Sequence, residues 1–172
     1  MRTVVEWARK VWQSTGEPCN VIEDGLVNEK MFTEATGDIV TQLDAITAEP
    51  SPYRWELVGN RRVLCPRDST WSSRITNVHL KQTPRFQAAT NYLEILRAQV
   101  PGLGNVVGPI LKGDPAAPIF TDKVSLSEEA SVVEHLVQLL GTAPQLVFLI
   151  ERTADGRRLL QFENVEPPSG QT

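Results

Sequence analysis

The sequence has no long apolar run. No segment approaches the roughly 20 consecutive apolar residues that span a bilayer. Charges at Arg2, Glu6, Arg9 and Lys10 interrupt the first turns of the chain, where a secretory signal needs an unbroken apolar stretch. We therefore expect no membrane span. We expect a cytoplasmic protein if the chain is complete, or a periplasmic one if a leader has been removed.

The sequence also lacks an excess of positive charge. Its 17 lysines and arginines face 21 aspartates and glutamates, which gives a net charge of −4. Proteins that bind nucleic acids gather Lys and Arg against the phosphates, so we expect no nucleic-acid partner. The remaining composition, 41% hydrophobic and 22% charged over 172 residues, is typical of a folded chain with a substantial core.

Cysteine and histidine are scarce, with two of each. Cys19 and Cys65 each lie beside a proline, and we expect half-buried free thiols there, with a disulfide as the alternative that would indicate export. His79 and His135 are predicted to lie on the surface, and no signature of a catalytic nucleophile accompanies them. These absences favour a protein without catalytic residues, metal or cofactor.

The first part of the chain predicts an N-terminal helix followed by a strand–helix–hairpin unit. Apolar residues recur at helical spacing over residues 3–14, and a short strand is expected at residues 19–23. In order, the unit then comprises a strand at 31–33, a helix capped by Thr36 with Ile39, Leu43 and Ile46 on its apolar face, and strands at 53–58 and 61–65 around the turn Gly59-Asn60.

The third quarter of the chain predicts a strand, a helix and a long loop. Alternating apolar residues indicate a strand at 75–81, and Thr83-Pro84 indicates the start of a helix with Phe86 and Leu93 on its apolar face. Residues 102–118 are rich in glycine and proline and are expected to form a loop, which is long for a compact domain.

The last part repeats the pattern of the first unit. In order, we expect a strand at 119–126, a helix capped by Ser125 with Glu128 or by Ser127 and ended by Gly141, and strands at 145–152 and 157–164 around Asp155-Gly156. The sequence therefore predicts an α+β fold of two similar strand–helix–hairpin units, which form small mixed sheets with helices packed on one face, plus the N-terminal helix. The expected halves are 1–70 and 75–166, able to pack as one domain, with a disordered tail at 167–172.

This pattern resembles the short N-terminal domain shared by bacterial secretins and TonB-dependent receptors. The residues that carry the resemblance are PCNVIE (18–23), YRWELVGNRRVLCP (53–66) and VSLSEEASVVEHLVQLLG (124–141). The resemblance implies interlocked βαβ units. It also implies a docking role in secretion or transport at the bacterial envelope, without enzymatic activity.

Six residues are candidate contacts with a partner. Trp7 and Trp71 show no clear apolar register, and aromatic residues outside the core are enriched at interfaces. The other four are the arginine pair beside the first hairpin turn and two glycines of the long loop: Arg61, Arg62, Gly102 and Gly104.

We expect a protein-interaction module that binds a protein partner or itself, docking through an exposed strand edge. The alternative is a small-molecule-binding protein or enzyme with a site between the halves, under residues 102–118. The glycine-rich segment 102–108 does not favour phosphate binding, because it follows a predicted helix instead of opening one after a strand.

Overall fold

The computed structural model describes the chain in nine stretches. These are residues 3–23, 37–49, 51–67, 86–88, 103–106, 123–125, 130–141, 145–152 and 158–165. The helices are α1 (Val4–Thr15), α2 (Ile39–Thr47) and α5 (Val132–Leu140), and the strands are β1 (Asn20–Ile22), β2 (Tyr53–Val58), β3 (Arg61–Pro66), β4 (Phe86–Ala88), β5 (Leu103–Val106), β6 (Lys123–Ser125), β7 (Leu146–Arg152) and β8 (Arg158–Asn164).

Local signals define both ends of α1. The Thr3 hydroxyl accepts a hydrogen bond from the Glu6 N–H at 3.1 Å, and the Glu6 carboxylate accepts one from the Thr3 N–H at 3.2 Å. This reciprocal cap satisfies N–H groups that the first turn leaves unpaired. Gly16 ends the helix in the left-handed region, at φ 71°, and donates to the Trp12 carbonyl. The predicted N-terminal helix is confirmed.

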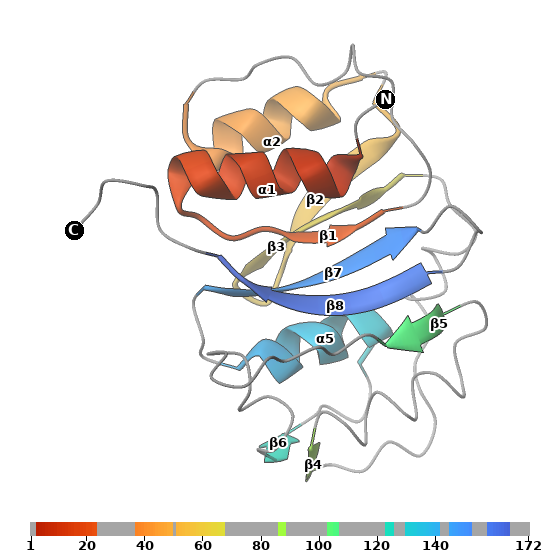
Figure 1. Ribbon diagram of the computed structural model, residues 1–172. Helices are drawn as coiled ribbons and strands as arrows, with labels where there is room; N and C mark the ends of the chain where they lie inside the picture. The colour runs from red at the N-terminus through yellow and green to blue at the C-terminus, as the bar shows by residue number, and fades with distance from the viewer. Residues whose placement is uncertain are drawn as a thin grey trace.

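Six strands form one mixed sheet in the order β2-β3-β1-β7-β8-β5, and β4 pairs with β6 in a separate two-stranded sheet. β1 lies parallel to both β3 and β7, and the pairs β2–β3 and β7–β8 are antiparallel hairpins. β1 therefore joins the two hairpins into a continuous sheet (Figure 1). The predicted α+β class is confirmed, and the two units share this sheet.

The two units cover opposite faces of the sheet. α1 and α2 lie over one face and α5 lies over the other (Figure 1). All three residues of β1 and the first five of β7 are buried, which is the pattern of strands that are covered on both sides. In both units a helix precedes a hairpin. The units differ in how they meet β1, which pairs with β3, the second strand of the first hairpin, and with β7, the first strand of the second hairpin.

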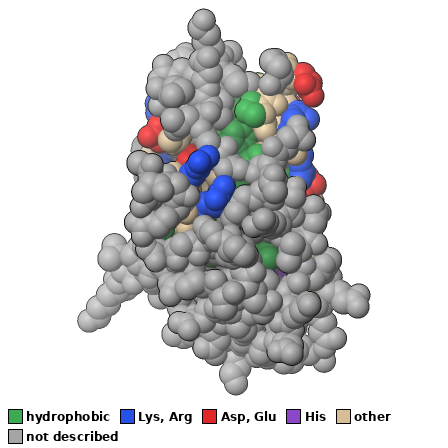
Figure 2. Space-filling view, turned by 90° about the vertical axis from the view of Figure 1, so that its right-hand side faces the viewer, with side chains coloured by type: hydrophobic (Ala, Val, Ile, Leu, Met, Phe, Trp, Pro, Cys, Tyr) green, Lys and Arg blue, Asp and Glu red, His purple; other side chains and the backbone are tan. Residues whose placement is uncertain are grey.

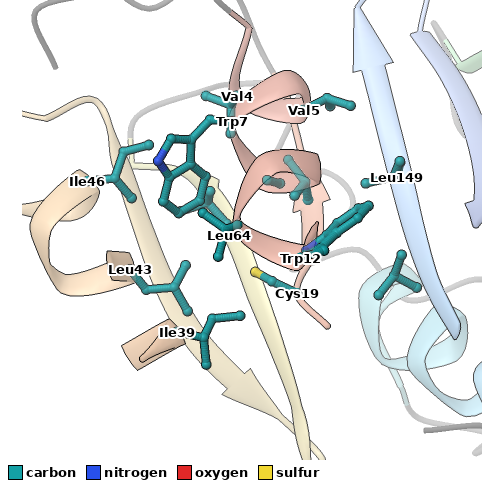
Figure 3. Close-up of a cluster of buried hydrophobic side chains, with 14 of the residues drawn as sticks. Val4, Val5, Trp7, Trp12, Cys19, Ile39, Leu43, Ile46, Leu64 and Leu149 are labelled. Atoms are coloured by element: carbon teal, nitrogen blue, oxygen red, sulfur yellow. The ribbon is translucent and has the colours of Figure 1, made fainter. Parts of the chain in front are cut away.

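The main core lies between α1, α2 and the sheet. Figure 3 shows Trp7 pointing toward Ile46 of α2 and Trp12 pointing toward Leu149 of β7. Leu43 and Leu64 are fully buried in the same cluster. The predicted apolar face of α2 is thus confirmed, although its cap is Asp38, whose carboxylate accepts from the Thr41 N–H at 2.8 Å, and not Thr36.

Three predictions for the second half are wrong. The cap of α5 is Ser131 with Glu134, not Ser125 or Ser127. Ser125 and Ser131 are each followed by glutamate three residues later, so the pattern alone cannot choose between them. Phe86–Ala88 forms strand β4 where a helix was expected, and Leu103–Val106 forms β5 inside the expected loop. In both segments, pairing with a distant strand overrides the local preference.

Several predictions fall outside the described residues. These are the strands at 31–33 and 75–81, the helix beyond residue 88, the turn Asp155-Gly156, His79 and the tail at 167–172. Within the described part of the chain, none of the helices has the length and apolar character needed to cross a bilayer.

Candidate protein-interaction site

β2 forms one edge of the six-stranded sheet, and no other described strand pairs with its outer side. The Arg67 N–H donates to the Pro52 carbonyl at 2.8 Å, one step beyond the Tyr53–Pro66 pair of the register. Residues 52 and 67 are therefore a hydrogen-bonded pair. Hydrogen-bonded and non-hydrogen-bonded pairs alternate along an antiparallel ladder. The next pair, Tyr53 and Pro66, is therefore non-hydrogen-bonded, which suits Pro66 because it has no N–H.

This alternation fixes the direction of every backbone group in β2. Arg54, Glu56 and Val58 occupy the hydrogen-bonded positions and direct their N–H and C=O groups toward β3. Trp55 and Leu57 occupy the intervening positions and direct theirs away from β3. The outer edge of β2 thus presents backbone donors and acceptors in the spacing that another extended strand requires.

α2 runs antiparallel to β2 and flanks this edge. The Trp55 indole Nε1 donates to the Asp44 carboxylate at 2.9 Å, and the Arg67 guanidinium donates to the Thr47 carbonyl at 2.6 Å. The end of α2 therefore lies at the start of β2. Val40 lies on the same helical face as Asp44, one turn earlier, and is consequently placed toward the end of β2.

Among the described residues, Leu57 and Val40 are the large hydrophobic side chains that remain exposed, at 63% and 38%. Trp55 is partly buried against the main core. We call the surface formed by Val40, Arg54, Trp55, Glu56 and Leu57 the β2 edge. It combines backbone groups that no other described strand pairs with and exposed apolar side chains, a combination that marks strand-pairing surfaces.

The face of β2 opposite Trp55 and Leu57 carries two charges. Arg54 and Glu56 are two residues apart and therefore lie on the same side of the strand. The Arg54 Nη1 lies 3.0 Å from the Glu56 Oε2, and both side chains are partly exposed. Within one chain, this ion pair neutralises the charge of the edge strand.

A second polar region lies at the carboxyl ends of β1 and β7. Glu23 follows β1 and is only 3% exposed. Burial raises the pKa of Glu23, while hydrogen bonds from the backbone N–H groups of Val5 and Arg152 oppose that rise. Figure 2 looks onto these strand ends and shows basic side chains near the centre of the face, with acidic side chains at its margins.

Arg9 ties α1 to the second hairpin. Its guanidinium donates to Glu163 of β8 and lies 3.4 Å from Glu151 of β7. The hydrogen bond to Glu163 is the main cause that raises the pKa of Arg9. These contacts give the charges a structural role, and no group of three or more His, Cys, Asp or Glu in the described ranges is placed to hold a metal ion.

Trp7, Arg61 and Arg62 are engaged within the chain. Trp7 is 6% exposed and packs in the main core, so the expectation that it lies outside the apolar face is wrong. Arg61 donates to the carbonyls of Leu146 and Gly141 at 3.1 and 3.2 Å, and burial lowers its pKa. Arg62 is partly buried, and its carbonyl accepts from Asn20.

The loop candidates are described only in part. Trp71 and Gly102 lie outside the described residues. Gly104 lies in β5, where the register with β8 is irregular between Leu103 and Asn105. The alternative small-molecule site under residues 102–118 lies mostly outside the described ranges, so that hypothesis stays a prediction.

His135 and the two cysteines are fully buried. The expectation of a surface His135 is wrong, because α5 buries a broad face. The buried residues of this helix are Val132, Val133, His135, Leu136, Leu139 and Leu140. Cys19 and Cys65 are free thiols, as predicted. Burial raises the pKa of Cys19 to about 12 and that of Cys65 to about 11, so both remain protonated near neutral pH and are poor nucleophiles.

Asn20 is a buried polar residue that the sequence analysis overlooked. Its Nδ2 donates to the Arg62 carbonyl of β3 at 3.0 Å, and its Oδ1 accepts from the Phe148 N–H of β7 at 2.9 Å. One side chain therefore bonds to both hairpins from the strand between them. The available signal was a lone amide in the otherwise apolar segment Cys19–Ile22.

No protein-family model, curated protein or solved structure matches the chain. The resemblance to the short N-terminal domain of secretins and TonB-dependent receptors stays a prediction. Function must therefore be argued from the β2 edge itself.

Proposed function

We propose that this protein is a non-catalytic docking module that binds a protein partner by adding an extended strand to the β2 edge. The observation that carries the proposal is the outward direction of the Trp55 and Leu57 backbone groups, next to a Leu57 side chain that is 63% exposed. Strand addition uses backbone hydrogen bonds for affinity and alternate side chains for specificity, and the β2 edge supplies both.

The regularity of β2 supports this role. All six residues pair with β3 in an unbroken register, and β2 contains no proline and no lysine. Proteins usually protect an exposed edge with charged side chains, with proline or with a bulge. The two charges of β2, on Arg54 and Glu56, pair with each other at 3.0 Å. A regular edge with an exposed leucine is therefore better suited to pairing than to solvent.

The resemblance to the secretin and TonB-dependent receptor domain supports a more specific version of the proposal. In that version, the docking serves secretion or transport at the bacterial envelope. The fold adds a mixed sheet with helices on both faces, which holds β2 rigidly while leaving its outer side available among the described strands.

Photo-crosslinking tests the proposal. A benzophenone amino acid at Leu57 is expected to form covalent protein adducts in lysate of the producing cells, and mass spectrometry then identifies the attached peptide. The same probe at Gln13, an exposed position on α1, is the matched control. Adducts specific to Leu57 support docking through the β2 edge. The absence of any adduct at Leu57, or the same adducts from both positions, contradicts it.

A further inference from the structure

We infer that the partner strand belongs to another protein and reads apolar, basic, apolar, acidic. It pairs antiparallel with β2, so that these four residues lie opposite positions 57, 56, 55 and 54 in that order. The inference rests on the proposed docking function and deepens it by naming the chemistry of the partner. It is carried by the length of the open edge, the positions of its charges and the exposure of Leu57.

The stretch of β2 that can accept a strand is short. At its start, Tyr53 is 1% exposed, and its N–H donates to the Ser51 hydroxyl at 3.2 Å. At its end, Gly59 enters the hairpin turn at φ 60°. The outward-directed groups between these limits belong to Trp55 and Leu57. An antiparallel strand meets them with two hydrogen-bonded pairs, and antiparallel pairing is slightly more stable per residue than parallel pairing.

This short stretch does not suit a second copy of β2. A twofold axis at Trp55 requires Tyr53 to pair as well, and the N–H of Tyr53 is already used within the chain. An axis at Glu56 places this carboxylate opposite itself, and like charges directly opposite destabilise pairing. An axis at Leu57 places Trp55 opposite Gly59, which is not extended. β5, at the other edge of the sheet, reads LGNV and carries no charge.

The charges of β2 lie where cross-strand contacts are closest. Arg54 and Glu56 form hydrogen-bonded pairs with β3, so they fall in non-hydrogen-bonded pairs with an outer strand, where opposite side chains approach most closely. Their side chains are 36% and 46% exposed and are accessible to charges on a partner. An acidic residue opposite Arg54 and a basic residue opposite Glu56 stabilise the pairing, and the exchanged order destabilises it.

The apolar positions of the partner follow from the other face of β2. Leu57 is 63% exposed, and an apolar residue opposite it removes apolar surface of both side chains from water. Trp55 packs against the main core, and its indole donates to Asp44. The partner residue opposite Trp55 therefore meets an aromatic side chain that is held in place. Successive side chains of a strand alternate between faces, so the two apolar residues alternate with the two charged ones.

A displayed peptide library tests the inference. Each peptide carries four randomised residues between flanks of glycine and serine, and multivalent display makes weak strand pairing detectable. We expect wild type to enrich apolar–basic–apolar–acidic peptides at least about fivefold over peptides with the two charges exchanged. R54E/E56R has the same composition as wild type and is expected to enrich the exchanged order by the same factor. Enrichment of neither order by wild type, or of the same order by both proteins, overturns the inference.

Leu57→Lys tests the apolar position separately. This variant is expected to lose about threefold of the enrichment for an apolar first residue, because that residue no longer meets an apolar side chain. Gln13→Lys adds the same charge at an exposed position of α1 and should keep the wild-type preference. An unchanged preference in Leu57→Lys would contradict the assigned register.

The crosslinking experiment separates this inference from the proposed function. An adduct at position 57 whose attached peptide reads apolar, basic, apolar, acidic supports both. Adducts that are specific to position 57 but whose peptides lack this order overturn the inference and leave docking intact. No adduct at all contradicts both.

Discussion

At the scale of single residues, Glu23 is a carboxylate that the fold buries almost completely, at 3% exposed. Burial raises the pKa of Glu23 above its ordinary value of 4.5, so the folded protein holds this proton more tightly than the unfolded chain does. The stabilisation from protonated Glu23 is complete below pH 4.5 and is lost as the pH rises through the raised pKa. At neutral pH, the ionised form therefore weakens the fold.

Glu23→Gln removes this ionisation while keeping an oxygen that can accept the Val5 N–H. We expect the free energy of unfolding of the variant to increase relative to that of wild type as the pH rises. The gain is about 1.4 kcal/mol for each pH unit that separates the folded and unfolded pKa values. Urea denaturation from about pH 4 to about pH 8 measures the difference.

Glu49→Gln is the control for this experiment, because the Glu49 side chain is 83% exposed and its loss is expected to change little. A difference between Glu23→Gln and wild type that does not vary with pH would show that Glu23 titrates normally in the folded protein.

Residue environments on the helices were only partly predictable from the sequence. Ile39 and Leu43 are buried as expected, because their spacing defines a narrow apolar face. Trp7 and His135 were misplaced, because amphipathic residues fit either side of a helix by type alone. Their burial depends on which helical face meets the sheet, and that depends on contacts from distant parts of the chain.

At the scale of elements, the first hairpin both forms the β2 edge and contacts the second unit. Gly59 adopts φ 60°, which suits the two-residue turn expected from Gly59-Asn60. Its nearest side chain is Val137 of α5. Beside this turn, Arg61 donates to the carbonyl of Gly141, which ends α5, and to the carbonyl of Leu146, which begins β7. The positive charge of Arg61 also interacts favourably with the C-terminus of α5.

Arg61→Ala is therefore expected to lower the free energy of unfolding by about 1–2 kcal/mol, because two hydrogen bonds from a partly exposed cation are lost. Guanidinium denaturation measures this change. Lys10→Ala, on the exposed side of α1, should change stability by less than about 0.5 kcal/mol. Equal effects of the two substitutions would mean that Arg61 does not hold the units together.

Element type was predictable where the signal was local, as in α1 and the β2–β3 hairpin. The strands β4 and β5 were not, because they exist only through pairing with β6 and β8. The same limit applies to the candidate site. The sequence predicted docking through a strand edge, but β2 becomes the edge only because β1 pairs with β3. Arg54, Glu56 and Leu57 were consequently not singled out.

At the scale of the whole molecule, β1 makes the two units one structure. The sequence predicted halves at 1–70 and 75–166, and nothing in the local pattern indicates that a strand of three residues lies between them. β1 pairs with both hairpins, and Asn20 adds a hydrogen bond to each. Both hairpins and β1 are therefore expected to unfold together.

Asn20→Ala tests this coupling in the full chain. The substitution leaves the buried Phe148 N–H and Arg62 carbonyl without their amide partner, so we expect a loss of about 2–4 kcal/mol. Amide hydrogen exchange should show reduced protection in both β3 and β7, because Asn20 bonds to both strands. Asn164→Ala, at the exposed end of β8, should leave protection in β3 unchanged. Loss of protection in only one hairpin would mean that the halves unfold independently and that β1 does not couple them.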